Sequence, residues 1–480
     1  MESNTKKLAS NALVYGLFGL LQKGLGFFLL PVYASLLDTD ELGIISTSTA
    51  VISFLVILFG LSLRGSTAYY YYKFKDQDID YVKKFFGTNF SFILLFTVFG
   101  ILLLFLGKEW VLEVLFKNIP FKPYVLLSLA SVLLQPTYLF YQSILKAKHQ
   151  AKKASLLDFL FFGTMASITI TLIVVFNFKA EGALLANSIA SFLVFIVSLI
   201  GIRKEITLCL DFAILKTSLK YSLPILPHNL SGWAMNMVDK LMLNNLNSLS
   251  IVALFDVGAQ IGKVVNLISL GVNSAYSPWF FEQVRSRPKE KNIIVDVTNK
   301  IILLYACVAV AASLLSPEVL VIIGKPSYYE SWKVVPFIAN AFVINGFYFT
   351  YSNVFFLEKT KYLPVLTIIG AITNLTLNYF MIPAYGIFGA AIASLTTKII
   401  FTLLTYTICQ RIYPIPYHRL HLIIIFSTCF LLSCLPFFIQ EYLEKISFIQ
   451  RILIKSLVLL LIFLPIIYKN ASQIKAIIKK

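Results

Sequence analysis

Charged residues stand inside some of the most apolar stretches of this chain. The segment PHNLSGWAMNMVDKLMLNN, residues 227–245, carries Asp239 and Lys240 near its centre, and Asp256 and Lys263 lie in the next apolar run. A charge at the middle of a membrane helix costs roughly 3 kcal/mol on insertion scales, so it normally has a partner or a function. Ammonium groups could bind an anion here, and carboxylates could bind a cation.

These side chains must be positioned by membrane-spanning helices. Hydrophobic residues make up 58% of the 480 residues and charged residues 13%, and the mean hydropathy of +0.81 exceeds that of water-soluble domains. A spanning helix needs about 20 mainly apolar residues. The predicted spans are roughly 9–36, 42–66, 85–106, 124–145, 155–176, 182–202, 221–245, 251–279, 297–315, 334–357, 364–382, 386–409, 420–439 and 451–468. We therefore predict an all-α polytopic membrane protein with 14 transmembrane helices, because the apolar runs lack the alternation of a membrane β-barrel.

Basic residues are concentrated in alternate loops. With the N-terminus inside, the inner loops hold pairs such as Lys83 with Lys84 and Lys152 with Lys153, whereas the outer loops hold few. This positive-inside pattern predicts that both termini are cytoplasmic. The net charge of +18 then follows from topology, and nucleic acid is not an expected partner. The first apolar run is too long for a cleavable signal, and the five cysteines show no disulfide or metal spacing.

The sequence repeats itself at a spacing of 207 residues. Residues 152–190 and 359–397 share a basic loop, a span, a glycine-bearing outer turn and a span rich in small residues, in that order. Six helices per half is an even number, so the halves would insert the same way up and be related by a pseudo-two-fold axis along the membrane normal. Chance similarity between apolar segments is the alternative.

A weaker match at a spacing of 210 places residues 36–46 beside 246–256, with Gly43 opposite Ala253. Both segments are expected to be tight outer hairpins between a span with a polar stripe and the span that follows. The predicted organisation is an N-lobe at 1–206, a C-lobe at 207–412, and helices 13 and 14 with a cytoplasmic tail at 413–480.

Polar residues follow one face of the first, seventh and eighth predicted helices. Such stripes cannot face lipid, so they face other helices or water. Their members include Lys23 on the first helix, Asn229, Trp233, Asn236 and Lys240 on the seventh, and Asp256, Gln260 and Lys263 on the eighth. Basic residues outnumber acidic ones there, so a cavity between the lobes should attract an anion. For the asparagines, hydrogen bonding between helices is an equal alternative.

The remaining basic residues and motifs give weaker indications of a binding or catalytic site. Arg64, near the inner end of the second span, could line the cavity mouth or extend to the membrane surface, and Lys300 and Lys455 are expected to do the latter. GAQIGKV at 258–264 is one residue short of a phosphate loop and lacks its hydroxyl residue. No catalytic or metal-binding pattern is apparent, so no catalytic residue, metal site or organic cofactor is predicted.

Three segments resemble a known family. LLQKGLGFFLLPVYASLLDTDELGIIS, PILPHNLSGWAMNMVDKLMLNNL and LFDVGAQIGKVVNLISLGVNSAYSPWFFE are similar to the oligosaccharyl-lipid flippases of bacterial O-antigen and capsule synthesis, within the multidrug/oligosaccharidyl-lipid/polysaccharide exporter superfamily. The resemblance implies movement of an undecaprenyl-diphosphate-linked oligosaccharide across the cytoplasmic (inner) membrane by alternating access. Family members carry an aspartate followed by a basic residue, commonly arginine, in span 7. Here the pair is Asp239 and Lys240, and lysine offers a point charge in place of a bidentate fork.

The sequence thus predicts a flippase, not an enzyme, with three sets of binding residues. They are Lys23, Arg64, Lys240 and Lys263 for the diphosphate, Asn229, Trp233, Asn236 and Gln260 for the glycan, and Asp239 or Asp256 for a coupling proton or sodium ion. The expected partners are the lipid-linked oligosaccharide, the bilayer, a polysaccharide polymerase and a chain-length regulator. Two alternatives stay open, a cation-coupled drug or metabolite exporter of the same superfamily and a membrane polysaccharide polymerase or glycosyltransferase.

Overall fold

The computed structural model describes residues 25–76, 78–358 and 360–478, and every regular element in these ranges is a helix. In the first half of the chain the helices are α2 (Leu25–Leu36), α3 (Thr39–Gly60), α4 (Leu63–Phe74), α5 (Ile79–Leu106), η1 (Lys108–Leu112), α6 (Glu113–Leu115), η2 (Phe121–Val125), α7 (Leu126–Ala147), α8 (Ala151–Ile170), η3 (Thr171–Val175) and α9 (Lys179–Ile202). In the second half they are α10 (Phe212–Ser222), η4 (Leu223–Ile225), α11 (Leu226–Leu246), α12 (Leu249–Gly262), α13 (Val264–Ser286), α14 (Lys291–Ile323), η5 (Pro326–Val334), α15 (Val335–Ser352), α16 (Phe355–Glu358), α17 (Tyr362–Ile412), α18 (Arg419–Ser433), α19 (Pro436–Leu443) and α20 (Phe448–Ile478).

The predicted fold class is confirmed. Ten helices in the described part of the chain are long and apolar enough to cross a membrane. The 51-residue α17 supplies two antiparallel halves, because the chain reverses at Gly386, where φ is +55° and ψ is −127°. Side chains rarely tolerate that backbone conformation, so glycine is needed there. Asn374 and Thr397 hydrogen-bond across the two halves.

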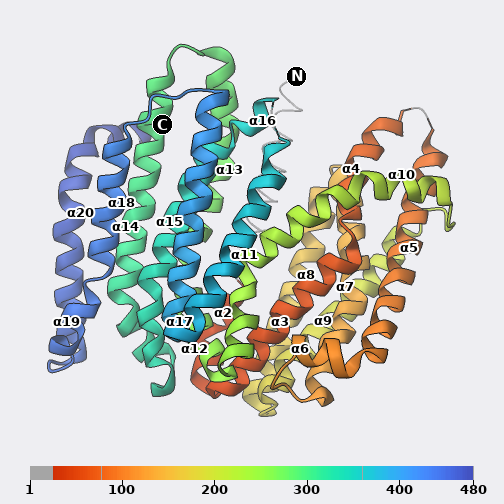
Figure 1. The fold of residues 1–480 in the computed structure, drawn as a ribbon, viewed down its shortest axis with the longest axis horizontal. Coiled ribbons are helices and arrows are strands. Elements are labelled where there is room, and N and C mark those ends of the chain that lie inside the picture. Colours follow the sequence, from red (N-terminus) through yellow and green to blue (C-terminus); the bar gives the residue numbers. More distant parts are fainter. Residues whose placement is uncertain (1–24, 77, 359, 479–480) are drawn as a thin grey trace.

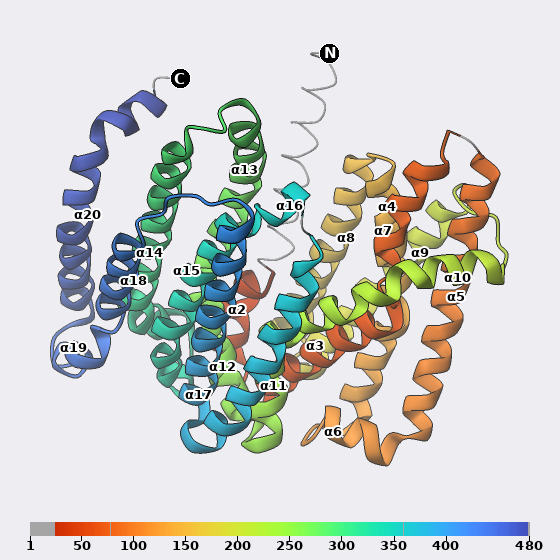
Figure 2. The ribbon, with the colours of Figure 1, turned by 45° about the horizontal axis from the view of Figure 1, so that its top comes forward.

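Two spans that the sequence predicts as continuous are broken. The second stops at Leu61 and Ser62, which both adopt left-handed backbone angles, and resumes as α4. The seventh is interrupted by the 3₁₀ turn η4, which contains Pro224. As a result α10 packs against α4 and α5, although the predicted boundary assigns it to the C-lobe. Figure 2 shows α10 running from these helices toward α11 at the centre of the molecule.

The helices form two groups that meet along α3, α11 and α12 (Figure 1). We call the contact between them the seam. At one end of the molecule, the closed end, the hairpins at 37–38 and 247–248 pack together. A Cβ at Gly43 would overlap the carbonyl oxygen of Leu249, so glycine permits this close approach of α3 to α12. One continuous apolar core joins both groups here and includes residues such as Leu42 and Ala253.

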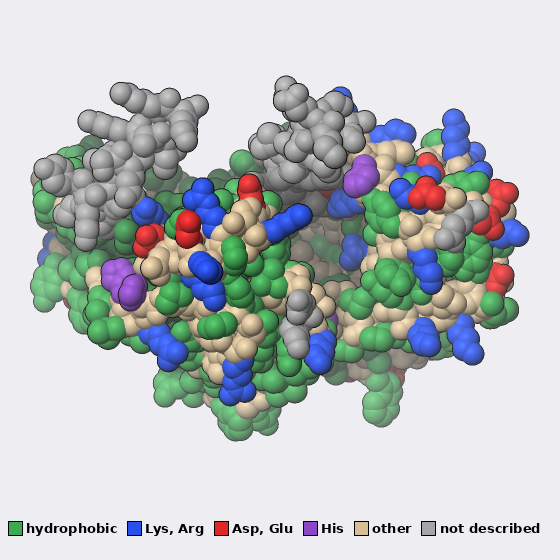
Figure 3. Space-filling view, turned by 90° about the horizontal axis from the view of Figure 1, so that it is seen from above, with side chains coloured by type: hydrophobic (Ala, Val, Ile, Leu, Met, Phe, Trp, Pro, Cys, Tyr) green, Lys and Arg blue, Asp and Glu red, His purple; other side chains and the backbone are tan. Residues whose placement is uncertain are grey.

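The opposite end, which carries residues 75–76 at the end of α4 and the loop at 287–290, is the open face. Figure 3 looks onto this face and shows a hollow between the two helix groups, with lysine and arginine side chains at its walls. Apolar packing on this side belongs to each group separately, as in the cluster built around Phe85, Phe140 and Ile214. The groups are therefore in dry contact at one end and separated at the other.

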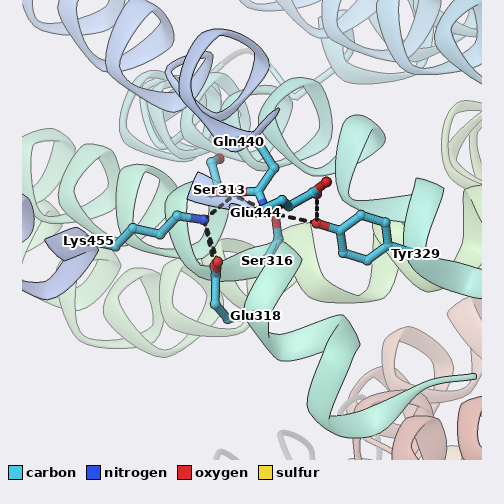
Figure 4. A network of polar contacts seen from close by, with 7 residues as sticks. All are labelled: Ser313, Ser316, Glu318, Tyr329, Gln440, Glu444 and Lys455. Atoms are coloured by element: carbon cyan, nitrogen blue, oxygen red, sulfur yellow. Dashed lines mark hydrogen bonds and ion pairs between the residues drawn. The ribbon is translucent and has the colours of Figure 1, made fainter. Parts of the chain in front are cut away.

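The last helices are fastened to the second group by a buried ion pair (Figure 4). Lys455 Nζ on α20 lies 2.6 and 2.8 Å from the carboxylate oxygens of Glu318 on α14, and 2.8 Å from Gln440 Oε1 on α19. Gln440 also donates to Tyr329, which donates to Glu444. The prediction that Lys455 extends to the membrane surface was wrong, because α14 continues to Ile323 and brings Glu318 inside, beyond the predicted end at 315.

Changing Lys455 to Met is expected to lower the free energy of unfolding by roughly 3–5 kcal/mol, because the Glu318 carboxylate would stay buried without its cation. Unfolding of the purified protein in detergent, followed by circular dichroism, measures this. The double variant Lys455→Met/Glu318→Gln should recover most of the loss. Lys445→Met, at an exposed position, is the control, and equal effects of Lys445→Met and Lys455→Met would contradict the structural role.

Candidate functional site

Asp239 and Lys240 are neighbours on α11 that reach different partners. Lys240 Nζ lies 2.8 Å from Asp256 Oδ1 on α12. The Asp239 carboxylate instead accepts hydrogen bonds from Asn378 at 2.5 Å and Ser394 at 2.8 Å, both on α17. Consecutive helical residues point about 100° apart, so the two side chains of this pair do not neutralise each other.

Asp256 connects the two helix groups. Its second oxygen, Oδ2, accepts a hydrogen bond of 2.5 Å from Ser46 on α3, which lies 210 residues earlier in the chain. Lys240 and Asp256 are only 4% and 7% exposed. Asp256, a predicted candidate for the coupling cation, thus has both carboxylate oxygens engaged by the protein.

Asp239 lies where α11 meets both halves of α17. Asn378 donates to Asn374 as well, at 3.2 Å, which extends the hydrogen-bonded network along the first half of α17. On the second half, Lys398 follows Ser394 by one turn, and its ammonium group is attracted to the Asp239 carboxylate. Lys398 is buried and has no ion pair within 4 Å among the described residues. Asp239 is therefore held by neutral donors, with a nearby but unpaired cation.

A cavity of about 40 Å³ lies between α11, α12, α15 and α17. Its polar lining consists of Asn236, Asp239, Lys240, Lys263, Ser394 and Lys398. Lys263, half-buried at the junction of α12 and α13, makes no hydrogen bond or ion pair with the part of the chain that the structure describes. The cavity is large enough for water or a small ion, and three lysines face two aspartates in and beside it.

Arg64 and Lys23 complete the predicted diphosphate set. Arg64 lies at the start of α4, directly after the break in the second span, and is exposed. It has no ion pair with a residue in the described ranges. Lys23 lies outside the described residues. The structure therefore brings Lys240 and Lys263 together and leaves Arg64 exposed on the other helix group.

The four predicted glycan residues lie in two environments. Asn229 donates to Ser62 at 2.8 Å across the seam. Trp233 donates to Ala50 and Ser53 on α3, and its ring packs on Phe54 at a centroid distance of 4.9 Å. Asn236 is exposed and, within the part of the chain that the structure describes, bonds only to Gly232 of its own helix, and Gln260 is half-buried on α12. The first two therefore join the helix groups, while Asn236 and Gln260 retain groups that a ligand could use.

Sequence reasoning missed the partners of Asp239 on α17. Asn374 and Asn378 are one helical turn apart, as are Ser394 and Lys398. Polar pairs at this spacing share a helix face, and that face cannot point to lipid. This pattern could have identified the last predicted spans of the C-lobe as part of the site.

Comparisons with known proteins agree with this architecture. The model of a family described as polysaccharide biosynthesis proteins matches residues 8–284, more than half of the chain. The chain belongs to this family. It is also 22% identical over 415 residues to the Lsg locus putative protein 1 of Haemophilus influenzae, covering 78% of this chain and 98% of that protein. An uncharacterized membrane protein of the same organism is 22% identical over 362 residues, with 74% and 85% of the two chains covered.

Solved structures show the same fold. The lipid II flippase MurJ, in an inward closed conformation, superposes with a TM-score of 0.72 at 15% identity and covers 96% of this chain and 100% of its own. An inward-facing MATE family transporter of the MOP superfamily gives a TM-score of 0.64 at 15% identity, with 84% and 96% covered. The chain therefore has the fold predicted from its resemblance to this superfamily, and this member of the polysaccharide biosynthesis family is a multi-pass membrane protein.

Changing Asn378 to Leu should lower the free energy of unfolding by roughly 1.5–3 kcal/mol, because the buried Asp239 carboxylate would lose a donor. Unfolding in detergent measures this loss. Asn89→Leu is the matched control, since Asn89 is equally buried and its side chain donates within its own helix, to the carbonyl of Phe85. The assigned role of Asn378 would be refuted if the two variants were equally stable.

Proposed function

We propose that this family member moves a lipid-linked oligosaccharide, joined to its lipid by a diphosphate, from the inner to the outer membrane leaflet by alternating access. The observation that carries the proposal is the surplus of unpaired cations. Lys263 and Lys398 have no ion-pair partner among the described residues, and Arg64 is exposed on the other helix group. A diphosphate is the fixed anionic part of such a lipid, and ammonium and guanidinium groups are its usual ligands.

In this proposal, the contacts that each residue already makes in the structure decide which part of the substrate it binds. Lys263, Lys398 and Arg64, together with Lys23, bind the diphosphate. Asn236 and Gln260 meet the sugars, and Asn229 and Trp233 become available as their contacts across the seam change. The cavity between the lysines is small, so the diphosphate would enter from the hollow on the open face and widen it.

We assign the open face to the cytoplasm and the protein to the bacterial inner membrane, because predicted basic inner segments, including residues 73–76 and the loop at 287–290, lie on that face. The substrate would then enter the hollow from the side on which lipid-linked sugars are assembled. A polymerase and a chain-length regulator would receive the product at the closed end.

Asp239 is the better placed of the two predicted groups for a coupling proton or sodium ion. Among the described residues its oxygens accept hydrogen bonds from neutral donors alone, whereas Asp256 already has an ammonium partner. Binding of a cation at Asp239 would act on the joint between α11 and α17. A drug exporter for organic cations, the alternative within the superfamily, would need an excess of acidic groups, and the lysine surplus argues against it.

Cells that depend on this protein for surface polysaccharide provide the test. Lys263→Ala and Arg64→Ala should each reduce surface polysaccharide roughly tenfold or more, since each removes a charged contact to the diphosphate. The undecaprenyl-linked precursor should accumulate on the cytoplasmic side. Lys84→Ala, on α5 at the far edge of the molecule, is the control. Normal polysaccharide in both the Lys263→Ala and the Arg64→Ala variant, at protein levels matched by immunoblot, would refute the proposal.

A further inference from the structure

A short chain of polar contacts runs from the lysine-lined cavity to the seam. Lys240 lines the cavity, and its ammonium group binds Asp256 at 2.8 Å. The other oxygen of Asp256 accepts the hydroxyl of Ser46 at 2.5 Å, on the far side of the seam. One carboxylate is thus shared between the candidate binding site and the contact that closes the molecule.

The Ser46–Asp256 bond lies in the dry part of the seam. Ala253 and Val257, on either side of Asp256 along α12, are fully buried in the apolar core that joins the two helix groups. Nearer the closed end, Ser250 hydrogen-bonds Thr39 at 3.1 Å and Asp40 at 2.5 Å. Because water is excluded, a charged carboxylate in this position depends on the partners that the protein provides.

We propose that Lys240, Asp256 and Ser46 form a latch that the anionic part of the substrate releases. This inference rests on the proposed function. A diphosphate held by Lys263 and Lys398 places negative charge beside Lys240 and draws its ammonium group away from Asp256. The carboxylate then lacks its cation in a dry seam, which is strongly unfavourable. Separation of α3 from α12 admits water to Asp256 and relieves that cost.

The chemistry of lysine suits this role. Its ammonium group is a compact charge on a flexible stem, so it can exchange one anionic partner for another. Lys263 and Lys398 form no ion pair within 4 Å with a described residue, whereas Lys240 contacts the carboxylate that bridges the seam. A ligand shifts a conformational equilibrium only through different affinities for the two states, and the exchange at Lys240 supplies that difference.

The rate of disulfide formation across the closed end measures whether the latch is closed. Cysteines replace Thr39 and Ser250, whose side-chain oxygens lie 3.1 Å apart, after the five native cysteines are changed to alanine. The rate of cross-linking in membranes reports how often α3 and α12 are in contact at the closed end. The probes are undecaprenyl diphosphate and, as the uncharged comparison, undecaprenol. Binding of both probes to the purified protein is measured separately by native mass spectrometry.

In the background protein, undecaprenyl diphosphate should slow cross-linking and undecaprenol should not. Ser46→Ala should slow it roughly threefold to tenfold without any ligand, because one hydrogen bond to a charged group is lost. Asp256→Asn should behave similarly and respond little to the diphosphate. Ser48→Ala is the matched control, since Ser48 is buried on the same helix with no hydrogen-bond partner among the described residues.

The possible failures are distinguishable. Equal cross-linking rates for Ser46→Ala and Ser48→Ala, with diphosphate binding intact, would overturn the latch and leave the proposed function standing. No preference of the background protein for undecaprenyl diphosphate over undecaprenol would overturn the proposed function and substrate-driven release together. Should Asp256→Asn fail to fold, Ser46→Ala alone decides, because it removes a single hydroxyl group.

Discussion

Charge inside a membrane protein is stable only with partners, and this constraint separates two kinds of lysine in the chain. Lys455 is surrounded by a carboxylate and an amide oxygen, and its role is to fasten α20 to α14. Lys263 and Lys398 are held in the same low-dielectric environment without an ion-pair partner among the described residues. Burial alone does not distinguish a lysine with a structural role from one that can bind a ligand. The distinction is whether the ammonium group already has an ion-pair partner.

The seam obeys a second, geometric constraint. Thr39, Asp40 and Ser46 bond to residues 210 or 211 positions later, so the two segments that the sequence matches at a spacing of 210 face each other across the seam. Their backbones approach closely, and Gly43 permits this by leaving room for the backbone of Leu249. Close packing and a few polar bonds thus hold one end together while the other stays apart.

The sequence predicts the features that depend on local pattern. Apolar length and charge distribution are sufficient for the all-α membrane fold, whereas the contact between the two hairpins matched at a spacing of 210 appears only in the structure. Partners far apart in the chain are not predictable in this way, because helical periodicity gives the face of a residue but not its neighbour. Asp239 and Asn378 are 139 residues apart. An error of a few residues at a helix end was enough to place Glu318 outside the membrane and leave Lys455 without its partner.

The interruption of the seventh span also determines how the two helix groups are tied. α10 is packed into the first group, whereas α11 lies in the seam against α17. Only the three residues of η4 separate them, and Pro224 supplies no backbone N–H there. Short irregular segments between rigid helices absorb rotation. At η4 the chain changes direction without disrupting either helix, so a single predicted span contributes α10 to one helix group and α11 to the contact with the other.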